Sequence, residues 1–204
     1  MITFYLIRHA EREGDQTLLA GRMPGLHLTA PGRVAADRVA GRLAAEPITQ
    51  VLSSPMERAR ETAEPIARRL GLELEVRPEL DEIDFGRWTG RTFHDLDATD
   101  EHWRLFNRVR SFTRIPGGEA MVEVQARFVA LMLRLQEASP NGGIALVSHG
   151  DPIKMALACF LGAPLDVYSR LEVGLASVSV VTLDDQGGKV IRLNEAPPTV
   201  TARG

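Results

Sequence analysis

The sequence has one cysteine, few aromatic residues and no long apolar run. Cys159 cannot form an internal disulfide, and no CxxC pair or Cys/His ligand set is present, which excludes a disulfide scaffold and a zinc ribbon. The 24 Lys and Arg residues against 27 Asp and Glu give a net charge of −3, which calls for neither nucleic acid nor an anionic membrane. The apolar segment at the start is too short for a signal peptide or a membrane span, so we expect a cytoplasmic protein.

Several catalytic signatures are absent as well. The motifs GxxxxGK[ST], GxGxxG, GxSxG and HExxH do not occur, so nucleotide P-loops, Rossmann cofactors, serine hydrolases and zincins find no support. We therefore expect no cofactor and no metal ion. The sequence does contain 204 residues, of which 44% are hydrophobic, and this is enough for a large core.

Strand-like segments alternate with helix-like segments along the chain. Runs rich in β-branched and apolar residues predict strands over 2–7, 48–52, 72–76 and 144–148, and a hairpin over 176–183 and 189–193. Helical spacing and capping residues predict helices over 29–43, 56–71, about 100–110, 119–137 and 149–161. The alternation predicts an α/β fold, with a mostly parallel sheet covered by helices on both faces.

No linker-like segment and no repeat divides the sequence. We expect a single domain over residues 1–196, in which the irregular segment of about 80–118 is an insertion that caps the functional site. Residues 197–204 are expected to form a disordered tail. Trp88 and Trp103 fall in this insertion, where they suit packing of the core or of a lid, although either could line a pocket.

Three predicted strands end in residues that suit an anion. Arg8 and His9 follow the first strand, Ser53 and Ser54 follow the second, and the segment 148–150 (Ser-His-Gly) follows the fourth. Ligands of open α/β sheets bind at the carboxyl ends of the strands. The three segments are therefore expected to meet in one pocket.

Such a pocket is suited to phosphoryl transfer. A neutral imidazole such as His9 can attack phosphorus, because its unperturbed pKa is about 6.5. Arg8 and Arg58 could clamp the phosphoryl oxygens, and His149 could donate a further hydrogen bond. A helix that starts at Pro55 would add free backbone N–H groups.

The leaving oxygen also needs a proton. Glu82, just after the third strand, is the candidate general acid, since partial burial and a neighbouring phosphate would raise its pKa. Asp81 and Asp84 compete with it for this role. In a second step the same group would act as a base and activate water.

Four segments resemble, in order, the signature blocks of the histidine phosphatase superfamily, in its phosphoglycerate-mutase-like branch. They are LIRHAE at 6–11, SSPMERARETA at 53–63, EIDFGRWTG at 82–90 and SHG at 148–150. The resemblance extends from residue 3 to about 184. It implies a three-layer α/β/α sandwich.

The resemblance also assigns roles within the site. It implies that His9 is phosphorylated, that Arg8, Arg58 and His149 form the phosphate pocket, and that Glu82 is the proton donor. Gly150 belongs to the last block and is an expected substrate contact. The segment 19–25 resembles a small-phosphatase or phosphomutase subgroup, which adds Gly21 and Arg22 as candidate substrate contacts.

Two positions depart from the family pattern. Ala10 stands where the family usually has glycine, and Asp15 stands where an asparagine is common, which puts phosphate contact at that position in doubt. The sequence also lacks room for the insertions of the cofactor-dependent mutases. The interpretation is therefore a metal-independent phosphatase, with a phosphomutase or a catalytically silent phosphate-ester-binding protein as alternatives.

The expected partner is a small phosphate ester, with no nucleic acid and no membrane. The substrate itself stays open among sugar phosphates, phosphoglycerates, nucleotide monophosphates and a cobalamin-precursor phosphate. The protein is expected to be a monomer or a homodimer, for which the hairpin over 176–193 could supply an edge strand. Gly117-Gly118-Glu119 reads as a helix start, with a substrate contact as the alternative.

Overall fold

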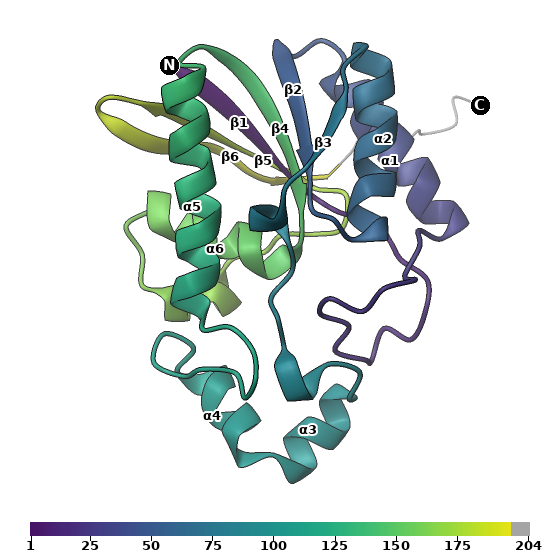
Figure 1. Ribbon diagram of the computed structural model, residues 1–204, viewed down its shortest axis with the longest axis vertical. Coiled ribbons are helices and arrows are strands. Elements are labelled where there is room, and N and C mark those ends of the chain that lie inside the picture. The colour runs from purple at the N-terminus through teal and green to yellow at the C-terminus, as the bar shows by residue number, and fades with distance from the viewer. Residues whose placement is uncertain (197–204) are drawn as a thin grey trace, which may run out of the picture.

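A computed structural model describes residues 1–196 of the protein (Figure 1). The tail predicted over 197–204 lies outside the described residues. Six strands form one sheet in the order β3-β2-β4-β1-β5-β6. They are β1 (Ile2–Arg8), β2 (Ile48–Ser53), β3 (Leu74–Val76), β4 (Gly142–Ser148), β5 (Val178–Asp184) and β6 (Gly187–Glu195).

The sheet is mostly parallel, as the sequence predicts. β1 and β2 both pair in parallel with β4, and β3 pairs in parallel with β2. β5 pairs antiparallel with both of its neighbours, β1 and β6. The parallel strands therefore end at the same edge of the sheet.

Helices cover both faces of the sheet. On one face α1 (Ala30–Leu43) and α2 (Glu57–Leu70) pack over Tyr5 and Ile7, and on the other face α5 (Met121–Ala138) and α6 (Gly150–Phe160) pack over Phe4 and Leu6 (Figure 1). Successive side chains of β1 alternate between the two cores because the side-chain period of a strand is two. The three-layer α/β/α architecture is thus confirmed.

Residues with strong local preferences set the helix ends next to the sheet. The Thr29 hydroxyl accepts a hydrogen bond from the Gly32 N–H at 2.9 Å and caps α1. Gly71 ends α2 in the left-handed conformation, with φ at 67°. Both helices then return the chain to the sheet, α1 to β2 and α2 to β3.

The segment between β3 and α5 forms a separate layer beyond the carboxyl ends of the strands (Figure 1). The helix predicted over about 100–110 is present as α4 (Glu101–Arg108), and a second helix, α3 (Phe93–Thr99), which was not predicted, precedes it. Thr92 and Asp100 cap them, and Asp100 interrupts the helical backbone between the two. Trp88, Trp103 and Phe106 form a third hydrophobic cluster here. Within residues 1–196, no helix combines the length and apolarity that crossing a bilayer requires.

Candidate active site

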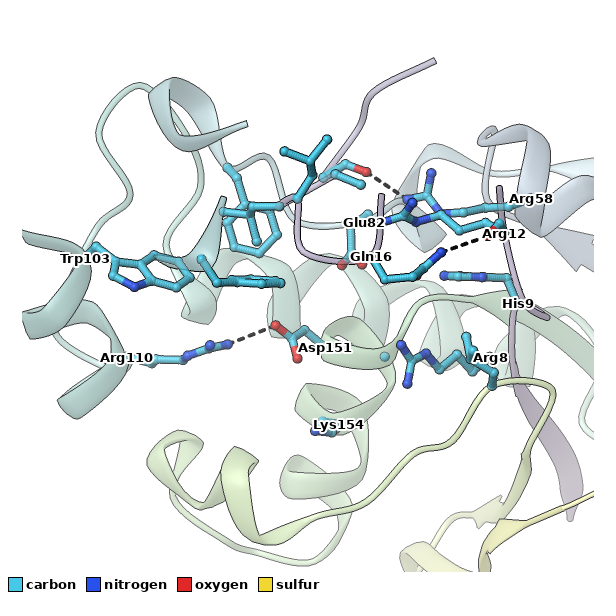
Figure 2. Close-up of a pocket in the computed structure, with 18 residues that line it drawn as sticks. Arg8, His9, Arg12, Gln16, Arg58, Glu82, Trp103, Arg110, Asp151 and Lys154 are labelled. Atoms are coloured by element: carbon cyan, nitrogen blue, oxygen red, sulfur yellow. Dashed lines mark hydrogen bonds and ion pairs between the residues drawn. The ribbon is translucent and has the colours of Figure 1, made fainter. Parts of the chain in front are cut away.

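A pocket of about 390 Å³ opens at the carboxyl ends of the parallel strands. His9, Arg8, Arg12 and Arg58 lie on one side of it (Figure 2). Trp103 and Arg110 lie on the opposite side, with Glu82 and Asp151 between the two groups (Figure 2). The structure therefore brings together segments that are far apart in the sequence, from β1, α2, α6 and the layer beyond the sheet.

The ring of His9 is held in one orientation at the end of β1. Its Nδ1 lies 2.8 Å from the carbonyl oxygen of Ala10 and, since a carbonyl can only accept, Nδ1 carries the proton. The Ala10 N–H in turn donates to Thr62 Oγ1 of α2 at 3.0 Å. Burial, followed by the charge of Arg58, lowers the pKa of His9 well below its usual 6.5. The ring is thus neutral near pH 7, with a free electron pair on Nε2.

Three side chains beside His9 each keep a buried polar atom without a hydrogen-bond partner among residues 1–196. These atoms are Arg8 Nε, Arg58 Nη1 and His149 Nδ1. The remaining groups of the two arginines are anchored, because Arg8 Nη1 donates to Val173 O and Arg58 Nη2 donates to Gly21 O, both at 2.7 Å. Buried polar atoms without partners are costly, and a cluster that includes two guanidinium N–H groups points to a ligand that accepts hydrogen bonds.

His149 lies fully buried next to the pocket and is not among the residues that line it. Its ring centroid is 5.1 Å from that of His9, and its Nδ1 is 3.9 Å from Glu82 Oε2. Its Nε2 contacts Ser54 Oγ at 2.8 Å. Burial and the charge of Arg58 lower the pKa of His149 well below 6.5, so this ring is also neutral.

The absence of a side chain at Gly150 leaves room for the guanidinium of Arg8. A Cβ at residue 150 would lie 3.3 Å from both Cζ and Nε of Arg8, so glycine lets the guanidinium pack against the first turn of α6. The helix whose start reaches the pocket is α6, which contributes Gly150 and Asp151 to the lining. The expectation of a helix start at Pro55 is wrong, because α2 begins at Glu57 and its first lining residue is Arg58.

Glu82 lies in the pocket wall with its side chain 16% exposed. Burial raises the pKa of Glu82 to about 7, the negative charge of Asp151 adds to the rise, and Arg58 opposes it. Its Oε1 accepts a hydrogen bond from the Ile83 N–H at 2.9 Å. A carboxyl group with this pKa can donate a proton near neutrality and accept one afterwards.

The two competing carboxylates have other contacts and do not line the pocket. Asp81 Oδ1 accepts from the Glu82 N–H at 2.8 Å and from the Ser54 hydroxyl at 3.2 Å. Asp84 Oδ1 accepts from the Gly86 N–H at 2.9 Å. Both shape the backbone on either side of Glu82, which leaves Glu82 as the carboxylate of this segment that faces the pocket.

Gly21 and Arg22 occupy different places. Gly21 lines the pocket and its carbonyl oxygen holds Arg58. Arg22, which we expected to contact substrate, does not line the pocket; its guanidinium pairs with Asp81 at 3.3 Å and with Glu119 at 2.8 Å. The chain turns sharply after Gly21, whose φ is 49°, and directs the next side chain away from the pocket.

Asp15 does not line the pocket either. Its Oδ1 accepts hydrogen bonds from the N–H and the hydroxyl of Thr17 at 2.8 and 2.7 Å. The neighbouring Gln16 lines the pocket in its place, with its Nε2 held by Arg12 O at 2.8 Å (Figure 2). Ala10 is accommodated without exposure, because its methyl group is buried in the core beside α2.

Five polar residues that line the pocket were not predicted from the sequence. They are Arg12, Gln16, Arg110, Asp151 and Lys154. Arg110 Nη1 donates to Asp151 at 2.9 Å and so ties the layer beyond the sheet to α6. Arg12, Gln16, Asp151 and Lys154 lie close to the His9 and His149 blocks, and this proximity was a usable signal. Arg110 lies in the irregular segment, where no pattern marked it.

The sequence matches the Histidine phosphatase superfamily (branch 1) over residues 4–196. A bifunctional protein of Mycobacterium tuberculosis is 37% identical over 193 residues; the match covers 92% of this chain and 52% of that protein. The chain thus spans about half the length of that curated relative.

Two further relatives align over most of their own length. A protein of Escherichia fergusonii that bears the name "Probable phosphoglycerate mutase GpmB" is 32% identical over 183 residues, covering 89% of this chain and 85% of its own. The crystal structure of the alpha-ribazole phosphatase from Shigella flexneri superposes with a TM-score of 0.84 at 27% identity, covering 97% of this chain and 98% of that one. The chain therefore belongs to the histidine phosphatase superfamily.

Proposed function

We propose that this protein is a phosphatase that hydrolyses a small-molecule phosphate monoester through a phosphohistidine on His9. The observation that carries the proposal is the set of three unpartnered buried atoms, Arg8 Nε, Arg58 Nη1 and His149 Nδ1, beside a neutral imidazole. A phosphoryl group offers these atoms three acceptor oxygens while its phosphorus faces Nε2 of His9.

In the first step His9 Nε2 attacks phosphorus, a nitrogen–phosphorus bond forms, and the ester bond to the leaving oxygen breaks. Glu82, protonated below its pKa of about 7, transfers its proton to that oxygen. Arg8 and Arg58 meet the charge on the equatorial oxygens. His149 contributes a further N–H when Nδ1 carries the proton, which requires the Ser54 hydroxyl to turn from Asp81 Oδ1 and donate to His149 Nε2.

In the second step a water molecule attacks the phosphorus of the phosphohistidine. The Glu82 carboxylate takes the proton of that water, the nitrogen–phosphorus bond breaks, and inorganic phosphate leaves. His9 returns to its neutral form, because its Nδ1 keeps its proton on Ala10 O throughout. Side chains supply all the positive charge in this scheme, so we propose a metal-independent reaction.

The proposal is tested by phosphate release from a panel of phosphate monoesters in the presence of EDTA. We expect turnover by the wild type and by His27→Ala, since His27 is an exposed histidine paired with Glu61 outside the pocket. We expect loss of turnover in His9→Ala. Full hydrolysis by His9→Ala would refute the mechanism, and binding of esters without any turnover would favour a silent binding protein.

The phosphoglycerate-mutase name of one relative favours a second candidate, a phosphomutase. A mutase returns the phosphoryl group from His9 to the same substrate, whereas a phosphatase passes it to water. The same panel separates the two, because a mutase yields an isomerised ester with little free phosphate. We favour the phosphatase, since the sequence has no room for the insertions of cofactor-dependent mutases.

A further inference from the structure

A charged cluster outside the pocket surrounds the loop that carries Glu82. Glu119 lies at its centre, between the layer beyond the sheet and α5. Its Oε2 accepts hydrogen bonds from Arg22 Nη2 at 2.8 Å, from the Asp84 N–H at 2.9 Å and from Arg127 Nη2 at 3.2 Å. Its Oε1 accepts from Arg127 Nε at 3.0 Å. One carboxylate thus joins two arginines to the backbone two residues after Glu82.

The same two arginines hold the backbone of Glu82 itself. Its carbonyl oxygen accepts from Arg22 Nε at 2.8 Å and from Arg127 Nη2 at 3.1 Å. Arg127 Nη1 donates in addition to the carbonyl oxygen of Glu79 at 2.7 Å. The carbonyl groups before and at the acid are therefore fixed from α5 on one side and from the segment after Gly21 on the other.

Close packing of two glycines keeps Glu119 in register with this loop. A Cβ on Gly118 would lie 2.1 Å from Asp84 O, and a Cβ on Gly86 would lie 2.4 Å from Pro116 O. The backbones meet so closely that the Glu119 N–H donates to Asp84 O at 3.0 Å. This turn, for which the sequence predicted a helix start or a substrate contact, is built against the loop of the proposed general acid.

We propose that Glu119, acting with Arg22 and Arg127, is a positioning residue that aims the Glu82 carboxyl at the leaving oxygen. This inference rests on the proposed role of Glu82 as the general acid. Neither Glu119 nor either arginine lines the pocket, so the cluster acts through Glu82 and not on the substrate. Without the Glu119 carboxylate, Arg127 loses this ion pair, Arg22 retains the Asp81 carboxylate, and the Asp84 N–H loses its acceptor.

The dependence of rate on the leaving group tests this inference. The phenolate of phenyl phosphate leaves slowly unless it is protonated, whereas the p-nitrophenolate of p-nitrophenyl phosphate leaves readily. Only phenyl phosphate therefore needs a well-placed acid. We expect Glu119→Gln to lower kcat/KM for phenyl phosphate by about 10-fold or more, and for p-nitrophenyl phosphate by less than about twofold. The ratio kcat/KM reports the steps up to phosphorylation of His9 and leaves the common second step out.

Glu123→Gln, in the first turn of α5 and four residues after Glu119, is the matched control. Glu123 also forms an ion pair, with Arg114, and accepts a hydrogen bond from the Ala120 N–H, but it does not contact the loop that carries Glu82. We expect both substrates to react at wild-type rates in this variant. In a Glu82→Gln background, Glu119→Gln is expected to cost nothing further on phenyl phosphate, because its effect passes through Glu82.

Equal losses on both substrates, or an additive loss in the Glu82→Gln background, would overturn the positioning role and leave the proposed function intact. If Glu82→Gln itself slows both substrates equally, the assignment of Glu82 as the acid fails, and the positioning role fails with it. A lower rate in Glu119→Gln that Glu119→Asp does not partly restore would also count against the inference, since aspartate keeps the charge.

Discussion

The buried carboxylate of Glu82 is expected to cost the protein stability at high pH. Burial raises the pKa of Glu82 from its ordinary 4.5 to about 7 in the folded state. One pKa unit corresponds to about 1.4 kcal/mol, so ionised Glu82 destabilises the fold by about 3 kcal/mol. A raised acid contributes stability that is fully present below the unfolded pKa of 4.5 and is lost as the pH rises through about 7.

Glu82→Gln removes the ionisation and keeps the side chain's size and its acceptor for the Ile83 N–H. We expect the free energy of unfolding of the variant, relative to wild type, to increase by about 2 to 3 kcal/mol between about pH 5 and pH 8. Denaturation in urea, followed by circular dichroism at both pH values, measures it.

Glu64→Gln is the control, because Glu64 is exposed on α2 and its carboxylate stays in solvent whether the chain is folded or not. It should show no such change with pH. A Glu82→Gln variant whose stability relative to wild type is the same at both pH values would refute the argument. Such a result would mean that ionisation of Glu82 does not lower the free energy of unfolding.

Two further predictions concern the pocket. Arg58→Lys should lower kcat/KM by about 100-fold in steady-state kinetics, because lysine cannot hold Gly21 O and a phosphoryl oxygen at once. Arg60→Lys, at an exposed position on the same helix, should leave kcat/KM unchanged. Asp151→Asn removes a negative charge that raises the pKa of Glu82, so the fall of kcat/KM above about pH 7 should move to lower pH. An unmoved profile would contradict that link.

The sheet and several of the candidate site residues follow from local patterns. β1 and β4 are apolar on both faces and each leads into a polar block, so Arg8, His9 and His149 could be placed at one edge before the topology was known. The helix cap at Thr29 and the end at Gly71 are likewise local, because one residue's own conformation decides each.

The remaining parts of the site depend on tertiary contacts that leave no local trace. Arg110 meets Asp151 across 41 positions, and Glu119 reaches the Asp84 N–H across 35. Arg22 adjoins the lining residue Gly21, yet a turn with positive φ sends its side chain to the other side of the acid loop. The polar composition of these segments is compatible with many arrangements, and only the fold selects one.

The proposed mechanism depends on a covalent bond between phosphorus and Nε2 of His9. Rapid quenching of the enzyme with an activated phosphate ester at alkaline pH, followed by mass spectrometry of peptides, tests it most directly, because phosphohistidine survives base and not acid. We expect one phosphoryl group on the peptide that contains His9, in amounts that rise in Glu82→Gln, where water lacks its base. A wild-type enzyme that turns over while His9 stays unmodified under these conditions would contradict it.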